Sequence, residues 1–168
     1  MAFSSVAMTD ARAFHACPEC GAHYASASDS CALRFESLLA LDHSHREPWG
    51  SRHGQAFATF ALQHPSRYPT SLDAAWTALC RIYYLHEAAS RVFASLRDTA
   101  TRNVPNDALP SRPSRPTSVP TVTIADLATF AAESYPALLD AWSRATLLAW
   151  GAAAAIPAPT VPHRGSRT

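Results

Sequence analysis

Three cysteines near the start of the chain constrain its fold more than any other feature of the sequence. They follow the spacing C-x2-C-x10-C, with Cys17 and Cys20 in one short turn and Cys31 further along. Three of the four cysteines and six of the eight histidines lie within residues 1–64. Such a set is typical of zinc sites, in which four nitrogen or sulfur ligands form a tetrahedron. The sequence therefore predicts a metal-binding knuckle at the start of the folded domain.

The fourth ligand of this predicted site is not determined by spacing alone. The side chains available are those of His23, Asp42, His43, His45, His53 and His64. A helix predicted over 52–63 would separate His53 from His64 by about 16 Å along its axis, so one ion cannot bind both. We expect His53 to complete the site, because it lies at a helix start that can pack beside the knuckle. His64 would then cap the helix or line the site.

Several of these residues also have simpler explanations. Each histidine, taken alone, could be a surface group or a hydrogen-bonded core group. Cys80 lies inside an apolar helical pattern, so we expect a small buried hydrophobe there and not a ligand. Cys17 and Cys20 could form a redox pair, but a thioredoxin-like motif needs a β-α-β context, and the sequence shows none.

Apolar residues recur at helical spacing through most of the chain, without strand-like alternation. This pattern predicts helices over 31–43, 52–63, 72–97 and 124–154. Pro136 should kink or split the last of them, because proline removes a backbone hydrogen bond. The sequence thus predicts an all-α fold, a small bundle of about four to five helices built on the N-terminal knuckle.

The length of 168 residues suits one domain. We place this helical domain at residues 16–156 and its metal-binding part at residues 16–65. Residues 1–15 and 157–168 are expected to be disordered, because neither shows periodic apolar residues. Closely spaced prolines make 99–122 a long loop within the domain.

Charge and hydropathy give no indication of a nucleic-acid or membrane partner. The formal net charge is only +1, which offers no electrostatic basis for binding DNA, RNA or an acidic membrane surface. No stretch approaches the roughly 18–20 apolar residues that a membrane span needs, and residues 1–16 lack the pattern of a signal peptide. We therefore expect a cytoplasmic protein, where a Cys-x-x-Cys pair indicates metal or redox chemistry before a structural disulfide.

The sequence also resembles an uncharacterised bacterial family, a domain of unknown function. The likeness rests on a CP-x-CG motif at 17–21, Cys31 before Phe35, the run Leu38-Leu39-Ala40-Leu41, His53, the segment Phe60–Pro65, and the tryptophans Trp142 and Trp150. It covers roughly residues 16–152. Phe60 replaces the tyrosine of the family's Y-x-LQHP segment, and the histidines expected after Trp150 are absent. If those histidines serve a second site, the resemblance implies that this chain lacks it. It implies site positions but no reaction.

Our leading hypothesis is a small helical protein with a structural Zn²⁺ ion bound by Cys17, Cys20, Cys31 and His53. The lack of any nucleophile–base pair supports it. The alternative is a hydrolase-like metalloenzyme, in which three protein ligands and a water bind the ion and Asp42 or His64 acts as the general base. A third hypothesis is a thiol redox protein that uses Cys17 and Cys20. A protein or small-molecule partner is not identified by the sequence.

Overall fold

The computed structural model describes residues 15–26, 28–97, 109–127 and 129–152. The α-helices are α1 (Cys31–Asp42), α2 (His53–Gln63), α3 (Leu72–Tyr83), α4 (Ala89–Arg97) and α5 (Tyr135–Ala149). Short 3-10 helices are η1 (Gly50–Arg52), η2 (Pro69–Ser71) and η5 (Ile124–Leu127), and β1 (His15–Ala16) pairs antiparallel with β2 (His23–Tyr24). The predicted all-α bundle is confirmed. Of the residues predicted to be disordered, 1–14 and 157–168 lie outside the described residues, and His15 lies in β1.

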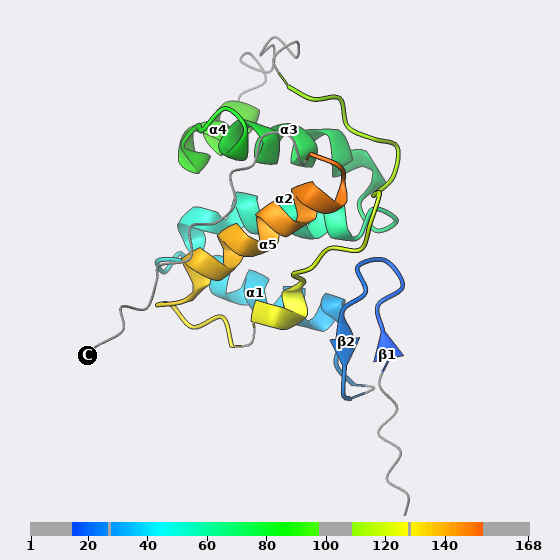
Figure 1. The fold of residues 1–168 in the computed structure, drawn as a ribbon. Coiled ribbons are helices and arrows are strands. Elements are labelled where there is room, and N and C mark those ends of the chain that lie inside the picture. Colours follow the sequence, from blue (N-terminus) through cyan, green and yellow to red (C-terminus); the bar gives the residue numbers. More distant parts are fainter. Residues whose placement is uncertain (1–14, 27, 98–108, 128, 153–168) are drawn as a thin grey trace, which may run out of the picture.

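Helix α2 lies at the centre of the molecule. Figure 1 shows α3 and α4 on one side of it, α5 beside it, and α1 with η5 and the β1–β2 hairpin on the other side. Helix α2 packs against α1, α3 and α5, and eight of its eleven residues are buried. A helix buried on most of its sides is stable only when neighbouring elements cover those sides.

The core has two parts, which meet at α2. The site-side core lies between the hairpin, α1, η5 and α5, and includes Cys20, Tyr24, Cys31, Phe35, Leu38, Phe60, Leu139 and Trp142. The distal core lies between α2, α3, α4 and the end of α5, and includes Leu62, Trp76, Leu79, Cys80, Val92, Leu147 and Trp150. Burying each large apolar side chain contributes about 1.5–3 kcal/mol. The stability of the distal core therefore does not depend on Cys17, Cys20 or Cys31.

A buried polar network fixes the position of α2 against α3 and α5. The amide nitrogen of Gln55 donates to the hydroxyl of Tyr83 at 2.6 Å and to the Oδ1 atom of Asp140 at 3.0 Å. The hydroxyls of Thr59 and Ser143 are 2.8 Å apart. Burial, followed by the charge of Asp140, raises the pKa of Tyr83. These hydrogen bonds form only when each helix has a particular rotation about its own axis. They therefore determine which face of α2 packs against α3 and which against α5.

The helix predicted over 72–97 is wrong in one respect, since two helices occupy it. The first, α3, ends at Tyr83, and α4 begins at Ala89. Between them His86 has a positive φ of 55°. The turn is held by Arg81, whose guanidinium donates to both carboxylate oxygens of Glu87 at 2.7 and 2.6 Å. No glycine or proline marks this break, so the helical periodicity continues through it.

The helix predicted over 124–154 also begins differently. Thr123 and Asp126 do form a cap, in which the backbone N–H of Thr123 donates to Oδ2 of Asp126 at 2.7 Å. The helical turn that follows, however, ends at Leu127, and α5 starts only at Tyr135. Pro136 lies in the first turn of α5, where its missing N–H has no intrahelical partner in any case. The expectation that Pro136 kinks or splits a helix is therefore wrong, because α5 begins directly before this proline and residues 129–134 are not helical.

The part of the Pro-rich loop that the structure describes, residues 109–122, contains no helix or strand. It follows the surface of α3 and α5. The indole of Trp76 donates to the carbonyl of Pro110 at 2.7 Å, and Arg112 forms an ion pair with Asp73 at 2.8 Å. No helix in the described part of the chain is long and apolar enough to cross a membrane.

Candidate metal centre

The first two cysteines lie in the turn that joins β1 to β2. Gly21 N–H donates to the carbonyl of Cys17 at 2.9 Å, and Cys17 N–H donates to the carbonyl of Ala22 at 2.8 Å. The turn needs a left-handed residue, and Gly21 supplies it with a φ of 73°. A Cβ atom at this position would lie 2.7 Å from Val119. The turn thus points the Cys17 and Cys20 side chains to the same side.

The third cysteine is the first residue of α1. Ser30 caps this helix, and its hydroxyl accepts a hydrogen bond from the N–H of Leu33 at 3.3 Å. Cys31 therefore lies where the positive end of the helix dipole favours a thiolate. The hydroxyl of Tyr24 donates to its sulfur at 3.0 Å. The helix start and the hairpin thus meet at the Cys31 sulfur.

The fourth donor is His64, directly after the last residue of α2. Its φ of −131° and ψ of 63° are not helical, because Pro65 disfavours the helical region for the residue before it. The imidazole stacks on the Phe60 ring, with centroids 4.1 Å apart. Its Nδ1 lies 3.0 Å from the Phe60 carbonyl. A carbonyl only accepts, so Nδ1 carries the proton and Nε2 is free to bind a metal.

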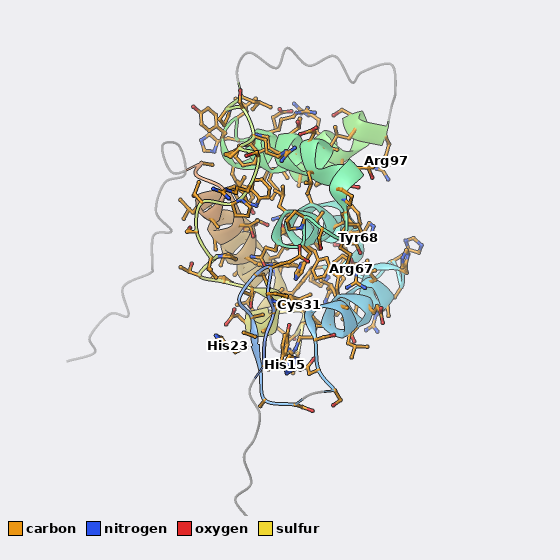
Figure 2. All side chains as sticks on the ribbon, turned by 90° about the vertical axis from the view of Figure 1, so that its right-hand side faces the viewer. His15, His23, Cys31, Arg67, Tyr68 and Arg97 are labelled. Carbon is orange, nitrogen blue, oxygen red and sulfur yellow. The ribbon has the colours of Figure 1, made fainter. Side chains whose placement is uncertain are left out.

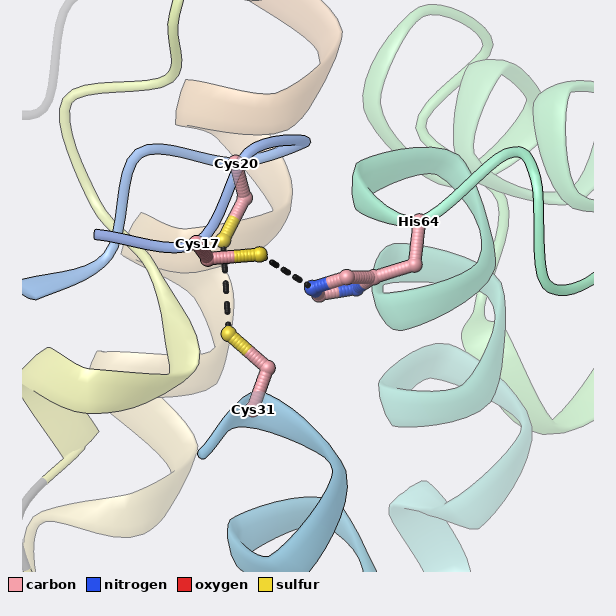
Figure 3. Close-up of side chains that lie close together, drawn as sticks. All are labelled: Cys17, Cys20, Cys31 and His64. Atoms are coloured by element: carbon pink, nitrogen blue, oxygen red, sulfur yellow. Dashed lines mark hydrogen bonds between the residues drawn. The ribbon is translucent and has the colours of Figure 1, made fainter. Parts of the chain in front are cut away.

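These four side chains converge in space, as Figure 3 shows. Their donor atoms all lie within 4.8 Å of one another. The sulfurs of Cys20 and Cys31 are 3.5 Å apart, and the sulfur of Cys17 lies 3.7 Å from Nε2 of His64. A tetrahedral zinc ion bound at about 2.3 Å to sulfur and about 2.0 Å to nitrogen sets a sulfur–sulfur separation of about 3.8 Å and a sulfur–nitrogen separation of about 3.5 Å. The donor set and its spacing therefore fit a zinc ion.

The electrostatics of the cluster favour a metal cation. The hydrogen bond from the Cys20 thiol, with help from His64 and Tyr24, lowers the pKa of Cys31 to about 4. The same hydrogen bond, together with burial, raises the pKa of Cys20. Burial, followed by the Cys31 contact, raises the pKa of Tyr24, which therefore stays a hydrogen-bond donor. A divalent cation bound here would stabilise the thiolate form of all three cysteines.

A further contact links the hairpin to the segment after His64. The carboxylate of Glu19 accepts hydrogen bonds from the backbone N–H and from the hydroxyl of Ser66, at 3.0 and 2.9 Å. Glu19 lies between the first two cysteines, and Ser66 follows His64 by two residues. The knuckle is thus joined to the end of α2 by protein groups as well as by the cluster itself.

The expectation that His53 completes the site does not agree with this placement. His53 begins α2 and His64 follows its last residue, about 16 Å further along the axis, and the hairpin docks at the His64 end. Instead, Nδ1 of His53 lies 3.0 Å from Oδ2 of Asp42, a carboxylate that is 3% exposed. This pair joins α1 to α2. The structure therefore places His64, and not His53, beside the three cysteines.

The remaining candidates lie elsewhere. His23, on β2, and His43 and His45, after α1, are exposed, and none belongs to the cluster. Cys80 is 1% exposed in the distal core, and its burial raises its pKa to about 12, as expected of a small core residue. Neither residue suggested as a general base is available for that role beside the cluster. Asp42 pairs with His53, and His64 is itself one of the four candidate metal ligands.

Sequence reasoning included His64 among the candidates but did not choose it. The signal that could have selected it is the sequence Gln63-His64-Pro65. A histidine before a helix-ending proline leaves the helical path, so its side chain can turn toward a neighbouring element. A histidine in the first turn, such as His53, keeps the direction that the helix gives it.

A comparison with known protein families matches residues 15–151 to a family of unknown function, DUF5946. The chain belongs to this family. The match spans the hairpin and all five described helices, so the DUF5946 domain contains every residue of the cluster. Comparisons with curated proteins and with solved structures found no match.

Proposed function

We propose that this DUF5946 protein is a zinc-binding protein in which Cys17, Cys20, Cys31 and His64 hold one structural ion. The observation that supports this most is the convergence of three thiols and one correctly oriented imidazole within 4.8 Å. The donors come from three segments that do not adjoin in the sequence. An ion at this point joins the hairpin, the start of α1 and the end of α2.

The number of donors favours a structural ion over a catalytic one. A catalytic zinc site keeps one position for water or substrate, whereas four protein donors complete the tetrahedron. The hydrogen bond from His64 to the Phe60 carbonyl is the kind of outer contact that fixes a ligand in place. Cys20 and Cys31 are nearly or fully buried at 0% and 5% exposure, which also suits a closed site.

Two variants of α2 test this proposal with a matched control. His64→Gln and His53→Gln change the same residue type at opposite ends of one helix. We expect about one zinc per chain in the wild-type protein and in His53→Gln, and loss of tight binding in His64→Gln. Elemental analysis of the purified variants, with zinc competition by a chelating dye, measures this.

The outcomes separate the hypotheses. Wild-type protein without transition metal, together with a Cys17–Cys20 disulfide that forms reversibly, would support the thiol redox hypothesis in place of this one. Zinc lost from His53→Gln but kept in His64→Gln would support His53 as the fourth ligand instead of His64. Zinc with three protein ligands and one water, seen by X-ray absorption, would favour the metalloenzyme.

A further inference from the structure

An open pocket of about 340 Å³ lies directly against the metal centre. Three of the four donors, Cys17, Cys31 and His64, line it, and Cys20 does not. The other walls come from the hairpin, the start of α1 and the segment after α2. Figure 2 shows His15, Cys31 and Arg67, which belong to these three segments, on one face of the molecule. The pocket therefore gives a small molecule access to the cluster from one side.

The three sulfurs differ in their access to this pocket. Cys20 is fully buried, and Cys31 is 5% exposed. Cys17 is partly exposed and lines the pocket. A molecule that enters from solvent thus meets the Cys17 sulfur first.

The sulfurs also differ in their hydrogen bonds. Cys31 accepts a hydrogen bond from the Tyr24 hydroxyl at 3.0 Å, and the sulfurs of Cys20 and Cys31 lie 3.5 Å apart. Within the described residues, the one hydrogen-bond partner of the Cys17 sulfur is His64, at 3.7 Å. With a metal bound, His64 would become a fellow ligand, and none of the described side chains would then donate a hydrogen bond to Cys17.

Charge and hydrogen bonding together decide which thiolate reacts. Zn²⁺ with three thiolates and one neutral imidazole carries a net charge of minus one, so its sulfurs keep nucleophilic character. A hydrogen bond to a thiolate stabilises its charge and lowers its reactivity, as at Cys31, whereas Cys20 is shielded by its complete burial. Exposure and the lack of a donor both select Cys17.

We propose that Cys17 is a zinc-activated nucleophile that accepts an alkyl group from a small soft electrophile in this pocket. This rests on the proposed zinc site. The Cys17 thiolate attacks the electrophilic carbon, a sulfur–carbon bond forms, and the carbon–leaving-group bond breaks with its electron pair on the leaving group. Cys17 becomes a neutral thioether, and the centre changes from a net charge of minus one to zero. Because a thioether is a weak zinc ligand, alkylation also loosens the site.

The test is limited alkylation of the zinc-loaded, full-length protein with iodoacetamide. Cys17, Cys20 and Cys31 all lie in the tryptic peptide between Arg12 and Arg34, so fragmentation mass spectrometry assigns the modified sulfur within one peptide. We expect Cys17 to react at least tenfold faster than Cys20 or Cys31. One iodide should be released per modified chain, and zinc should become more easily removed.

A pair of tryptophan substitutions tests the role of the pocket without changing a ligand. Ala16 is exposed and lines the pocket, whereas Ala40 is exposed on α1 and is not among the pocket residues. Ala16→Trp should slow the alkylation of Cys17 several-fold while zinc content stays at one per chain. Ala40→Trp should leave the rate unchanged.

Tyr24→Phe gives a second control. It removes the hydrogen bond to Cys31 and should raise the reactivity of Cys31, with Cys17 still first. The proposal would be overturned if the three cysteines were alkylated at one rate, or only as fast as zinc dissociates. It would also be overturned if Cys17 were alkylated at the same rate in Ala16→Trp and Ala40→Trp. Zinc content is measured separately, so protein that holds one zinc but lacks a reactive Cys17 refutes this inference alone.

Discussion

The site-side core and the distal core are held together by different means. The distal core buries tryptophan, leucine and valine between helices, and its one thiol, Cys80, lies inert within it. The site-side core also buries aromatic groups, such as Phe35 stacked on Phe60 at 3.9 Å. Its outer edge, however, is formed by thiols and a hairpin whose two strands have only two residues each. A hairpin of this size is not stable alone in water, so its position depends on what binds it.

This contrast separates two sources of stability. Apolar burial stabilises the helices whether or not zinc is present. A metal bound at the cluster would stabilise only the segments that supply its ligands, because binding free energy acts on the groups that binding orders. The following experiments test that division, from the largest expected effect to the smallest.

Cys31→Ala should have the largest effect, and it should be confined to one side of the molecule. Losing this ligand should abolish tight zinc binding, a loss that in small zinc peptides corresponds to about 10 kcal/mol or more. Residues 15–30 and the start of α1 should lose amide-exchange protection, while α3 and most of the helical circular dichroism remain.

Cys80→Ala is the matched control for that experiment. It removes a buried thiol from the distal core and should cost about 1 kcal/mol with zinc unchanged. Equal zinc content in wild-type protein and Cys31→Ala, or zinc loss in Cys80→Ala, would contradict the assignment of the third cysteine.

Two leucine truncations compare the cores with identical chemistry. Leu79 in the distal core and Leu38 in the site-side core are both 0% exposed. Each change to alanine should lower the free energy of unfolding of the zinc-loaded protein, measured in urea, by about 2–5 kcal/mol. Only Leu38→Ala should also weaken zinc binding, because Leu38 packs in the layer that supports the hairpin. Equal zinc affinities in the two variants would show that the cores are coupled more tightly than we infer.

The last expected effect is a pH dependence that belongs to the distal core. Burial raises the pKa of Cys80 from 9.0 to about 12 in the folded protein. Stability from the neutral thiol is therefore fully present below pH 9 and is lost as the pH rises toward 12. Between about pH 8 and pH 10.5 the free energy of unfolding should fall by about 2 kcal/mol more in the wild-type protein than in Cys80→Ala. Urea unfolding at the two pH values measures the difference, and parallel losses would contradict it.

Local patterns in the sequence were sufficient for much of the site. The spacing of Cys17, Cys20 and Cys31 and the glycine after the second cysteine predict the knuckle without any knowledge of packing. The ends of α1 and α2 were also close to prediction, because a serine cap and Pro65 mark them in the sequence.

The choice of His64 over His53 depends on long-range packing. Which end of α2 faces the hairpin is set by contacts such as Phe35 on Phe60 and Glu19 on Ser66, between segments well apart in the sequence. The break between α3 and α4 escaped prediction for a related reason. It depends on the Arg81–Glu87 ion pair, which has no turn-forming residue to mark it.

The Glu19–Ser66 contact has a consequence for the metal-free protein. Docking the hairpin closes the short chain between Cys20 and Cys31, an entropic cost of about 2 kcal/mol. The two hydrogen bonds of Glu19 are exposed and together offset a similar amount. The balance between docked and undocked hairpins in the metal-free protein then depends on the burial of Cys20 and Tyr24, and a bound metal would shift it further toward the docked state. The Glu19–Ser66 contact would thus hold the hairpin near the other ligands while a metal binds.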